Sequence, residues 1–416
     1  MTRSSPIIYP KINSTMSPYT IGIEEEYFIS KIESRDTCQK MPGGMAKAFR
    51  DGRGPFEREL LQSQIEAVTP PCESLAEART LIAGYRATLG ALGAEHGYAI
   101  VAAGTHPKAL WSRQRATDAT RYRAVMRDLQ MLGQRNMVCG LHVHVSVPDP
   151  DKRVALMGRI TPFLPLLLAL STSSPFWQGR STGLMGYRLA SYDELPRTGL
   201  PDQFDSAADY DQYIETMVAA RAIKNASYVW WAVRPSLHYP TLELRVADSC
   251  TRIDDAIAIA ALYRCLVRKL DRDETLNANP GAASRAIALE NKWRAQRYGI
   301  RGSFVDERRR EALSVKETLD DLIDLIGEDA EALGCLDEVL SARTIIKRGA
   351  SANCQIAIFE AARKSGAKKS DALNAVVDWL AATTAESGAS AGRGEKPEMR
   401  RANARNVSSG GEQLCL

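Results

Sequence analysis

The chain has 416 residues, of which 44% are hydrophobic and 25% are charged. This composition is typical of a globular protein with a sizeable core, and it excludes a chain that is disordered throughout. The 54 basic and 50 acidic residues leave a formal net charge of only +4, so the charge indicates no general affinity for polyanions and no nucleic-acid partner.

The N-terminal region begins with residues 1–18, which contain several prolines and are predicted to form a flexible arm. The next segment, TIGIEEEYFI, is predicted to be a strand. Successive side chains of a strand point to opposite faces, so Glu24 and Glu26 share the face opposite the apolar residues. Glu25 lies on the apolar face, where we expect it to pair with a basic group from a covering helix or to occupy a polar gap.

The segment FERELLQSQIEAVTPP adds Glu57, Glu59 and Glu66 to the acidic residues. Glu59 and Glu66 are separated by an odd number of positions, so a regular strand places them on opposite faces. They reach one site only through a bulge or a bend in the chain.

Two later strands repeat the alternation of an apolar and a polar face. In GLHVHVSV, the polar face carries His142, His144 and Ser146, and in TLELRV it carries Glu243 and Arg245. A one-sided sheet with a solvated face shows the same alternation, and each strand taken alone is compatible with it. Adjacent like charges are unfavourable unless a cation lies between them, so the three strands together favour a divalent metal site.

Helices are predicted elsewhere from apolar residues at helical spacing. Ser74 followed by Glu77 forms a capping-box pattern, and the helix after it ends before Gly97. Further helices are predicted over Asp254–Leu270, over Glu290–Tyr298 and, as several amphipathic helices, over Val315–Leu380. Residues 19–382 are therefore interpreted as one domain. Residues 383–416 are rich in Ser, Gly, Ala and charge and are predicted to be a disordered tail.

The cysteines and the apolar stretches indicate where in the cell the protein is located. Eight cysteines occur without a CxxC pair, in a chain too large to need disulfide bonds for stability, which predicts reduced thiols and a cytoplasmic location. The most apolar stretch, Ile160–Leu170, is interrupted by prolines and is shorter than the roughly 20 residues that span a bilayer. We therefore expect no membrane segment and no export.

Several of these segments, in this order, resemble the motifs of the type 2 glutamate-cysteine ligases, which belong to the glutamine synthetase superfamily. The segments are GIEEEYF, ELLQSQIEAVTPPC, GTHP, GLHVHVSV, STSSPFWQGRSTGLMGYR, RPSLHYPTLELRVADSC and ENKWRAQRYG. The resemblance covers roughly residues 20–380. It implies an α+β fold with a concave antiparallel sheet backed by helices, and a ligase that uses ATP with Mg²⁺ or Mn²⁺ to join a carboxylate to an amine.

The resemblance also implies roles for individual residues. One metal that bridges the ATP phosphates would be held by Glu24, His142 and Glu243. A second metal, near the substrate carboxylate, would be held by Glu26, Glu59 and Glu66. His144 would contact phosphate, and Arg245 would neutralise the transferred phosphoryl group. Substrate carboxylate or nucleotide would be bound by Arg180, Arg188 and Arg234.

The implied substrates are glutamate and cysteine, and a homodimer is compatible with the sequence. Two other functions remain open. A metal-dependent hydrolase also uses HxH patterns, although the remaining ligands here are mostly glutamates. An inactive, ligase-like protein that binds ATP as a regulator would keep the same residues without turnover.

Overall fold

A central antiparallel β-sheet carries most of the predicted site residues. The computed structural model describes residues 18–51, 54–278 and 281–389. The sheet has seven strands in the order β2-β3-β1-β5-β9-β8, and β4 also pairs with β1. Their bounds are β1 Ile21–Lys31, β2 Phe56–Arg58, β3 Gln64–Val68, β4 Tyr98–Val101, β5 Gly140–Ser146, β8 Val233–Pro235 and β9 Thr241–Asp248. The predicted α+β class with an antiparallel sheet is confirmed.

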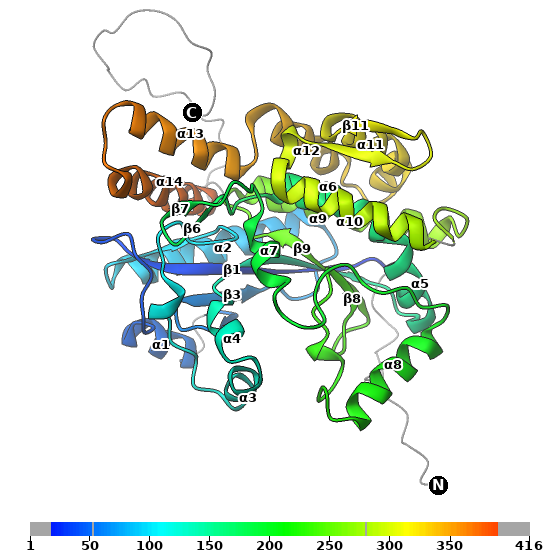
Figure 1. The fold of residues 1–416 in the computed structure, drawn as a ribbon, viewed down its shortest axis with the longest axis horizontal. Helices are drawn as coiled ribbons and strands as arrows, with labels where there is room; N and C mark the ends of the chain where they lie inside the picture. The colour runs from blue at the N-terminus through cyan, green and yellow to red at the C-terminus, as the bar shows by residue number, and fades with distance from the viewer. Residues whose placement is uncertain (1–17, 52–53, 279–280, 390–416) are drawn as a thin grey trace, which may run out of the picture.

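Helices cover one face of the sheet and flank the other (Figure 1). The first half of the chain contains α1 Gly43–Arg50, α2 Leu75–Ala94, α3 Thr120–Leu129, α4 Met131–Arg135, α5 Pro150–Ile160, α6 Leu164–Ser171 and α7 Tyr187–Tyr192. The second half contains α8 Ala207–Ala219, α9 Ile253–Arg272, α10 Ala282–Tyr298, α11 Val315–Ala332, α12 Leu336–Arg348, α13 Ser351–Lys364 and α14 Lys369–Ala389. Short hairpins are formed by β6 Phe176–Trp177 with β7 Arg180–Ser181 and by β10 Ser303–Asp306 with β11 Glu311–Ser314.

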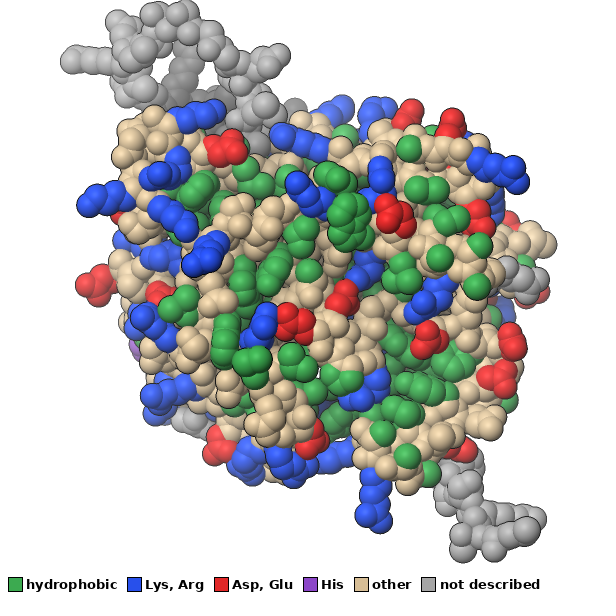
Figure 2. All heavy atoms as spheres, viewed as in Figure 1, with side chains coloured by type: hydrophobic (Ala, Val, Ile, Leu, Met, Phe, Trp, Pro, Cys, Tyr) green, Lys and Arg blue, Asp and Glu red, His purple; other side chains and the backbone are tan. Residues whose placement is uncertain are grey.

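The predicted helices are present. The helix after Ser74 begins as expected, because the Ser74 hydroxyl accepts a hydrogen bond from the backbone N–H of Glu77 at 3.2 Å. Helices α9 and α10 contain the two predicted segments and extend beyond them. On the face shown in Figure 2, basic and acidic side chains are interspersed, in keeping with their nearly equal numbers.

The most apolar helical stretch belongs to the core. Pro150–Ser171 is long and apolar enough to cross a membrane by composition alone, but 78% of its most apolar window is buried inside the protein. Every residue of α6, the second half of this stretch, is buried. The apolar composition of this stretch is therefore explained by its packing in the protein core.

Glu25 makes the ion pair predicted from its place on the apolar face. Its carboxylate accepts two hydrogen bonds from Arg86 of α2, at 2.8 Å and 3.0 Å, and both side chains are fully buried. Arg86 also donates to the backbone carbonyls of Cys250 and Thr251, and the Tyr27 hydroxyl donates to Glu25. The pair therefore joins β1, α2 and the segment after β9.

We expect Glu25→Gln to lower the free energy of unfolding by about 3–5 kcal/mol, because it leaves the buried charge of Arg86 without its partner. Denaturant unfolding of the two proteins measures the difference. In the control double variant, Glu25→Leu with Arg86→Met, neither charge of the pair remains, so part of the lost stability should return, and the rest stays lost because the carbonyls of Cys250 and Thr251 have no donor. A loss of less than about 1 kcal/mol for Glu25→Gln would show that the pair contributes little.

The C-terminal boundary of the domain lies later than the sequence predicts. Helix α14 continues to Ala389, past the predicted start of the tail at residue 383. Thr384 is fully buried, and its hydroxyl accepts a hydrogen bond from the backbone N–H of Ala102 at 3.1 Å. Composition does not reveal this packing, because it occurs through the hydroxylated residues Thr383 and Thr384. The remainder of the predicted tail, and the predicted arm up to residue 17, lie outside the described residues.

A chain that ends after Ala382 should melt several degrees below the full chain, because it loses the buried Thr384 and the last turns of α14. A chain that ends after Ala389 is the control, and we expect its melting temperature to match that of the full chain. Thermal unfolding followed by circular dichroism tests both expectations. Equal melting temperatures for all three chains would contradict the role given to Thr384.

Candidate active site

The polar residues of β1, β5 and β9 lie side by side on one face of the sheet, as predicted. In the antiparallel registers, Glu24 is opposite His142, and His144 is opposite Glu243. A bulge in the pairing of β5 with β9 between Leu141 and Val143 adjusts the spacing of these side chains.

Glu24 is held by both histidines of the HxH strand. Its carboxylate lies 3.1 Å from His142 Nδ1 and 3.1 Å from His144 Nε2. His144 Nδ1 is in turn hydrogen bonded to the Thr241 hydroxyl at 2.8 Å. Burial alone would raise the pKa of Glu24, but the hydrogen bonds from the histidines outweigh it and hold the pKa well below its usual value. Glu24 is therefore a carboxylate at neutral pH.

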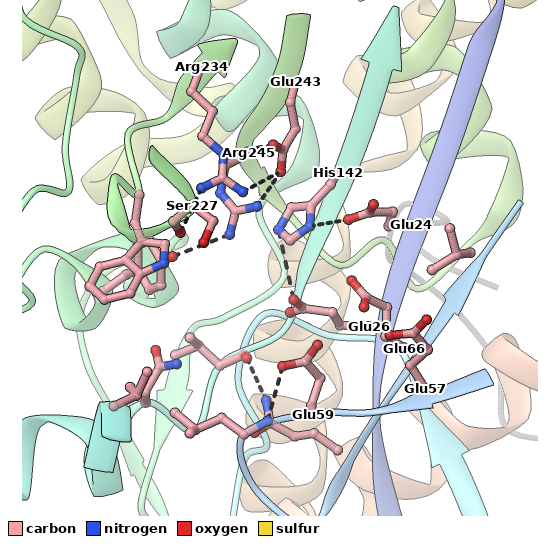
Figure 3. A pocket seen from close by; sticks show the side chains of 18 of the residues that line it. Glu24, Glu26, Glu57, Glu59, Glu66, His142, Ser227, Arg234, Glu243 and Arg245 are labelled. Carbon is pink, nitrogen blue, oxygen red and sulfur yellow. Dashed lines mark hydrogen bonds and ion pairs between the residues drawn. The ribbon is translucent and has the colours of Figure 1, made fainter. Parts of the chain in front are cut away.

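These side chains line a cavity of about 330 Å³ (Figure 3). The figure shows His142 with the carboxylates of Glu24 and Glu26 beside it, and with Glu243, Arg234 and Arg245 at the other end of the site. The cavity is also lined by Glu57, Glu59, Glu66, His144 and Arg188, and by Gln64, Arg121, Tyr122, Asn136, Tyr192, Ser227, Trp230, His238 and Tyr239. One wall is therefore acidic and another is basic.

Glu59 and Glu66 both reach the cavity, by a route that differs from the bulged strand considered above. The chain reverses between them, so β2 and β3 pair antiparallel and Glu57 lies opposite Glu66. Glu59 follows the last residue of β2 directly, and Glu66 lies opposite Glu26 of β1. The bend that the odd spacing requires is therefore the turn between β2 and β3.

Two groups of side chains have the chemistry and spacing of metal ligands. Glu24, His142 and Glu243 each offer a ligand atom, and these atoms lie within 4.8 Å of one another. The same holds for Glu26, Glu66 and His142. The first group is the set that the family resemblance implies, whereas in the second group His142 stands in the place expected for Glu59.

The electrostatics of the site also fit a cation. Burial, together with the neighbouring carboxylate of Glu59, raises the pKa of Glu26 to about 8. Burial and the surrounding carboxylates likewise raise the pKa of Glu66 well above its usual value. Within the described part of the chain, His142 Nε2 is buried without a hydrogen-bond partner. Burial, followed by the charge of Arg245, lowers the pKa of His142 to about 4. Crowded carboxylates beside a neutral imidazole are a donor set that suits Mg²⁺ or Mn²⁺.

Two of the predicted arginines form the basic wall by contacting Glu243. Arg234 donates two hydrogen bonds to the Glu243 carboxylate, at 2.7 Å and 3.3 Å, and Arg245 donates to one of the same oxygens. Burial would raise the pKa of Glu243, but the two guanidinium groups hold it far below its usual value. Glu243 thus remains ionised and keeps both arginines in place.

The other two predicted arginines, Arg188 and Arg180, differ in whether they line the cavity. Arg188 of α7 is buried, lines the cavity and stacks over Tyr192 with 5.7 Å between the guanidinium carbon and the ring centre. Arg180 is exposed on β7 and does not line the cavity, so the structure does not bring it together with the other predicted site residues. Its position on a short outer hairpin cannot be recognised from the residue type.

Sequence reasoning missed the aromatic and loop residues of the cavity. Tyr192 follows Arg188 by one helical turn, so a helix at GYRLASY would have placed both on one face. Trp230, His238 and Tyr239 come from the chain around β8, where no periodicity marks their direction. No sequence signal identifies these last three residues.

Comparisons with known proteins show the family of the chain and agree with the fold. The family model described as glutamate-cysteine ligase family 2 matches residues 20–373. A Bradyrhizobium diazoefficiens protein with the provisional name glutamate-cysteine ligase 2 is 45% identical over 388 residues, which cover 93% of this chain and 88% of the relative.

Two solved structures have a similar fold at 15% sequence identity. One is a bifunctional glutathione synthetase from Pasteurella multocida, with a TM-score of 0.65 over 88% of this chain and 52% of the other. The second is a glutamate-cysteine ligase from Francisella tularensis in complex with AMP, with a TM-score of 0.61 over 90% of this chain and 93% of the other. The fold is thus one that ligases of this kind share. By its sequence match, the chain belongs to glutamate-cysteine ligase family 2.

Without a bound cation, the free energy of unfolding should fall as pH rises from 7 to 8. Glu26 keeps its proton in the folded protein up to a pKa of about 8, but an unfolded glutamate loses it near 4.5. The folded state therefore binds more protons in this window, and each such proton lowers the stability by about 1.4 kcal/mol per pH unit. The lowered pKa of His142 changes the stability between about pH 4 and pH 6.5, below this window.

Thermal unfolding in EDTA at pH 7 and pH 8 measures this effect, and the same scans with Mg²⁺ should show a higher melting temperature and a weaker pH dependence. In the control variant Glu26→Gln, the pH dependence in EDTA should shrink. Identical melting temperatures at both pH values in EDTA would contradict the protonation assigned to Glu26.

Proposed function

We propose that this protein is an ATP-dependent carboxylate-amine ligase that activates a carboxylate as an acyl phosphate and joins it to an amine. One observation carries the proposal: two groups of cation ligands and two arginines share a single cavity in a chain of glutamate-cysteine ligase family 2. The proposed substrates are glutamate and cysteine. The AMP in the Francisella tularensis structure supports a nucleotide as the third ligand.

The two ligand groups would hold Mg²⁺ or Mn²⁺, the first through Glu24, His142 and Glu243 and the second through Glu26 and Glu66 with His142 or Glu59. When bound, these cations would neutralise negative charge on the carboxylate and on the triphosphate, both in the reactants and in the transition state. This fits the main barrier of the first step, which is the repulsion between a carboxylate and a triphosphate.

Arg245 and Arg234 act on the same barrier from the basic wall. Their guanidinium groups are held by Glu243 and can donate further hydrogen bonds to phosphoryl oxygens. Because they are in place before the substrates arrive, little reorganisation is needed as negative charge moves. His144, hydrogen bonded to Glu24 and Thr241, is positioned by the same network to contact phosphate.

The second step needs an amine close to the activated carbonyl carbon. The cavity is lined by side chains from β1, β3, β5, β8, β9 and α7, so it favours the reaction by holding the two substrates next to each other. A cytoplasmic location is part of the proposal, because ATP and reduced thiols are available there.

Transfer of an oxygen isotope tests the acyl phosphate route. The acid substrate carries ¹⁸O in its reacting carboxylate and is mixed with ATP, Mg²⁺ and cysteine. One labelled oxygen should appear in phosphate for each amide formed, because that oxygen leaves with the phosphoryl group. Mass spectrometry of the phosphate and of the amide measures both. A hydrolase would release phosphate that carries oxygen from water, and a silent ATP-binding regulator would release none.

The variants Glu24→Gln and Glu243→Gln should abolish this transfer while the protein stays folded, because each keeps the side-chain shape and removes the charge that a hard cation requires. Arg180→Gln is the matched control, since Arg180 is exposed and lies outside the cavity. Full ligase activity in either glutamate variant, or amide formation with unlabelled phosphate, would reject the proposed mechanism.

A further inference from the structure

Two cysteines outside the cavity, Cys265 and Cys335, lie with their sulfur atoms 3.4 Å apart. Both side chains are buried, and only 2% of Cys335 is exposed. The thiols of other described cysteines contact different groups: Cys38, Cys72 and Cys250 donate to the carbonyls of Gln62, Pro70 and Asp248, and Cys139 and Cys354 lie beside Gln64 and Arg252. Within the described part of the chain, Cys265 and Cys335 are therefore the cysteines placed to react with each other.

The pair connects two helices that are distant in the sequence but pack together (Figure 1). Cys265 lies within α9, and Cys335 is the N-cap residue of α12, 70 positions later. The backbone of Cys335 is fixed, because its N–H donates to the carbonyl of Ala330 at 2.9 Å and its carbonyl accepts from the N–H of Val339 at 3.1 Å. A disulfide bond is about 2.05 Å long, so the two sulfurs need to approach by only about 1.4 Å to form one.

The hydrogen bond between the two thiols makes them unequal as nucleophiles. With Cys265 as the donor, this bond lowers the pKa of Cys335 from its usual value, although burial opposes the shift. The same hydrogen bond, followed by burial, raises the pKa of Cys265. The charge of Arg264 also favours the thiolate of Cys335, whereas Glu338 in the first turn of α12 opposes it. Because the thiolate is the reactive form of cysteine, Cys335 is the better nucleophile.

Cys335 is also the member of the pair that lies nearer to solvent. It directly follows Gly334, an exposed residue of the turn between α11 and α12. Cys265, in contrast, belongs to a part of α9 that is buried throughout, from Asp255 to Val267. Surface turns open locally at a lower cost in free energy than core helices do, so a small oxidant reaches Cys335 first.

We propose that Cys265 and Cys335 form a modification site for a peroxide, which joins them by a disulfide bond. The Cys335 thiolate attacks one peroxide oxygen; an S–O bond forms, the O–O bond breaks, and the released hydroxide takes up a proton to become water. The sulfur of Cys265 then attacks the sulfur of the sulfenic acid on Cys335; the S–S bond forms, the S–O bond breaks, and the hydroxide leaves as water with the thiol proton. The two thiols together lose two electrons and two protons, and the peroxide is reduced to two waters.

Peptide mass spectrometry of the full chain tests this proposal without any substrate, so the result is independent of the proposed ligase function. The protein is reduced, freed of reductant, treated with hydrogen peroxide, blocked with N-ethylmaleimide and digested without reduction. The peptides that contain Cys265 and Cys335 should appear joined, lighter by two hydrogen atoms than their sum. The melting temperature should rise by several degrees and fall back with dithiothreitol, because the bond closes a long loop in the unfolded chain.

Serine variants separate the two roles. Cys265→Ser and Cys335→Ser should each abolish the joined peptide and the reversible rise in melting temperature. In Cys265→Ser, the sulfenic acid on Cys335 has no thiol to react with, so dimedone should label it, whereas Cys265 in Cys335→Ser should stay unlabelled. The matched control is Cys72→Ser, since the thiol of Cys72 is also buried but donates to the carbonyl of Pro70. This control should keep both the joined peptide and the rise.

The wild-type digest decides the linkage even if a serine variant does not fold. Cys265 and Cys335 peptides that stay separate in peroxide-treated, folded protein would overturn the proposal, and so would a joined peptide that forms only in denaturant. A lower melting temperature after oxidation would show that the bond does not fit the native fold. Dimedone labelling of Cys265 in place of Cys335 would reject the order of the two steps.

Discussion

The ion pair between Glu25 and Arg86 is the constraint on which the geometry of the site depends. Three consecutive glutamates occupy β1, and the alternation of a strand sends the middle one into the core and the outer two into the cavity. Arg86 binds the middle carboxylate and also the backbone after β9. A shift of β1 by one residue would bury Glu24 and Glu26 among apolar side chains, so the pair fixes the register of the strand that supplies both.

The cavity itself is electrostatically costly for the folded protein. Glu26, Glu59 and Glu66 are crowded and partly buried, and their raised pKa values express the free energy needed to ionise them there. At the other end, Glu243 is matched by two arginines and is ionised readily. The charge of one end is therefore balanced within the chain, whereas the crowded carboxyl groups at the other end retain protons.

The sequence predicts the parts of this arrangement that follow from strand alternation. Glu24, Glu26, His142, His144, Glu243 and Arg245 could be assigned to one face because side chains alternate along each strand, and the bulge between β5 and β9 leaves these side chains on the cavity side. Glu59 and Glu66 could not be reconciled with a single strand, because a turn separates them. The position of Arg180 and the end of α14 depend on tertiary packing, which residue type and composition do not encode.

The imidazole of His142 belongs to both ligand groups, and this sharing limits how they can be filled. Its Nδ1 faces Glu24, and its Nε2 lies 3.8 Å from Glu26. A neutral imidazole has a single lone pair, because the other nitrogen carries the proton. With two cations present, His142 can therefore ligate only one of them, and the other must complete its coordination with carboxylate oxygen. Glu59 is a carboxylate on that wall, so occupancy of one site selects the ligands of its neighbour.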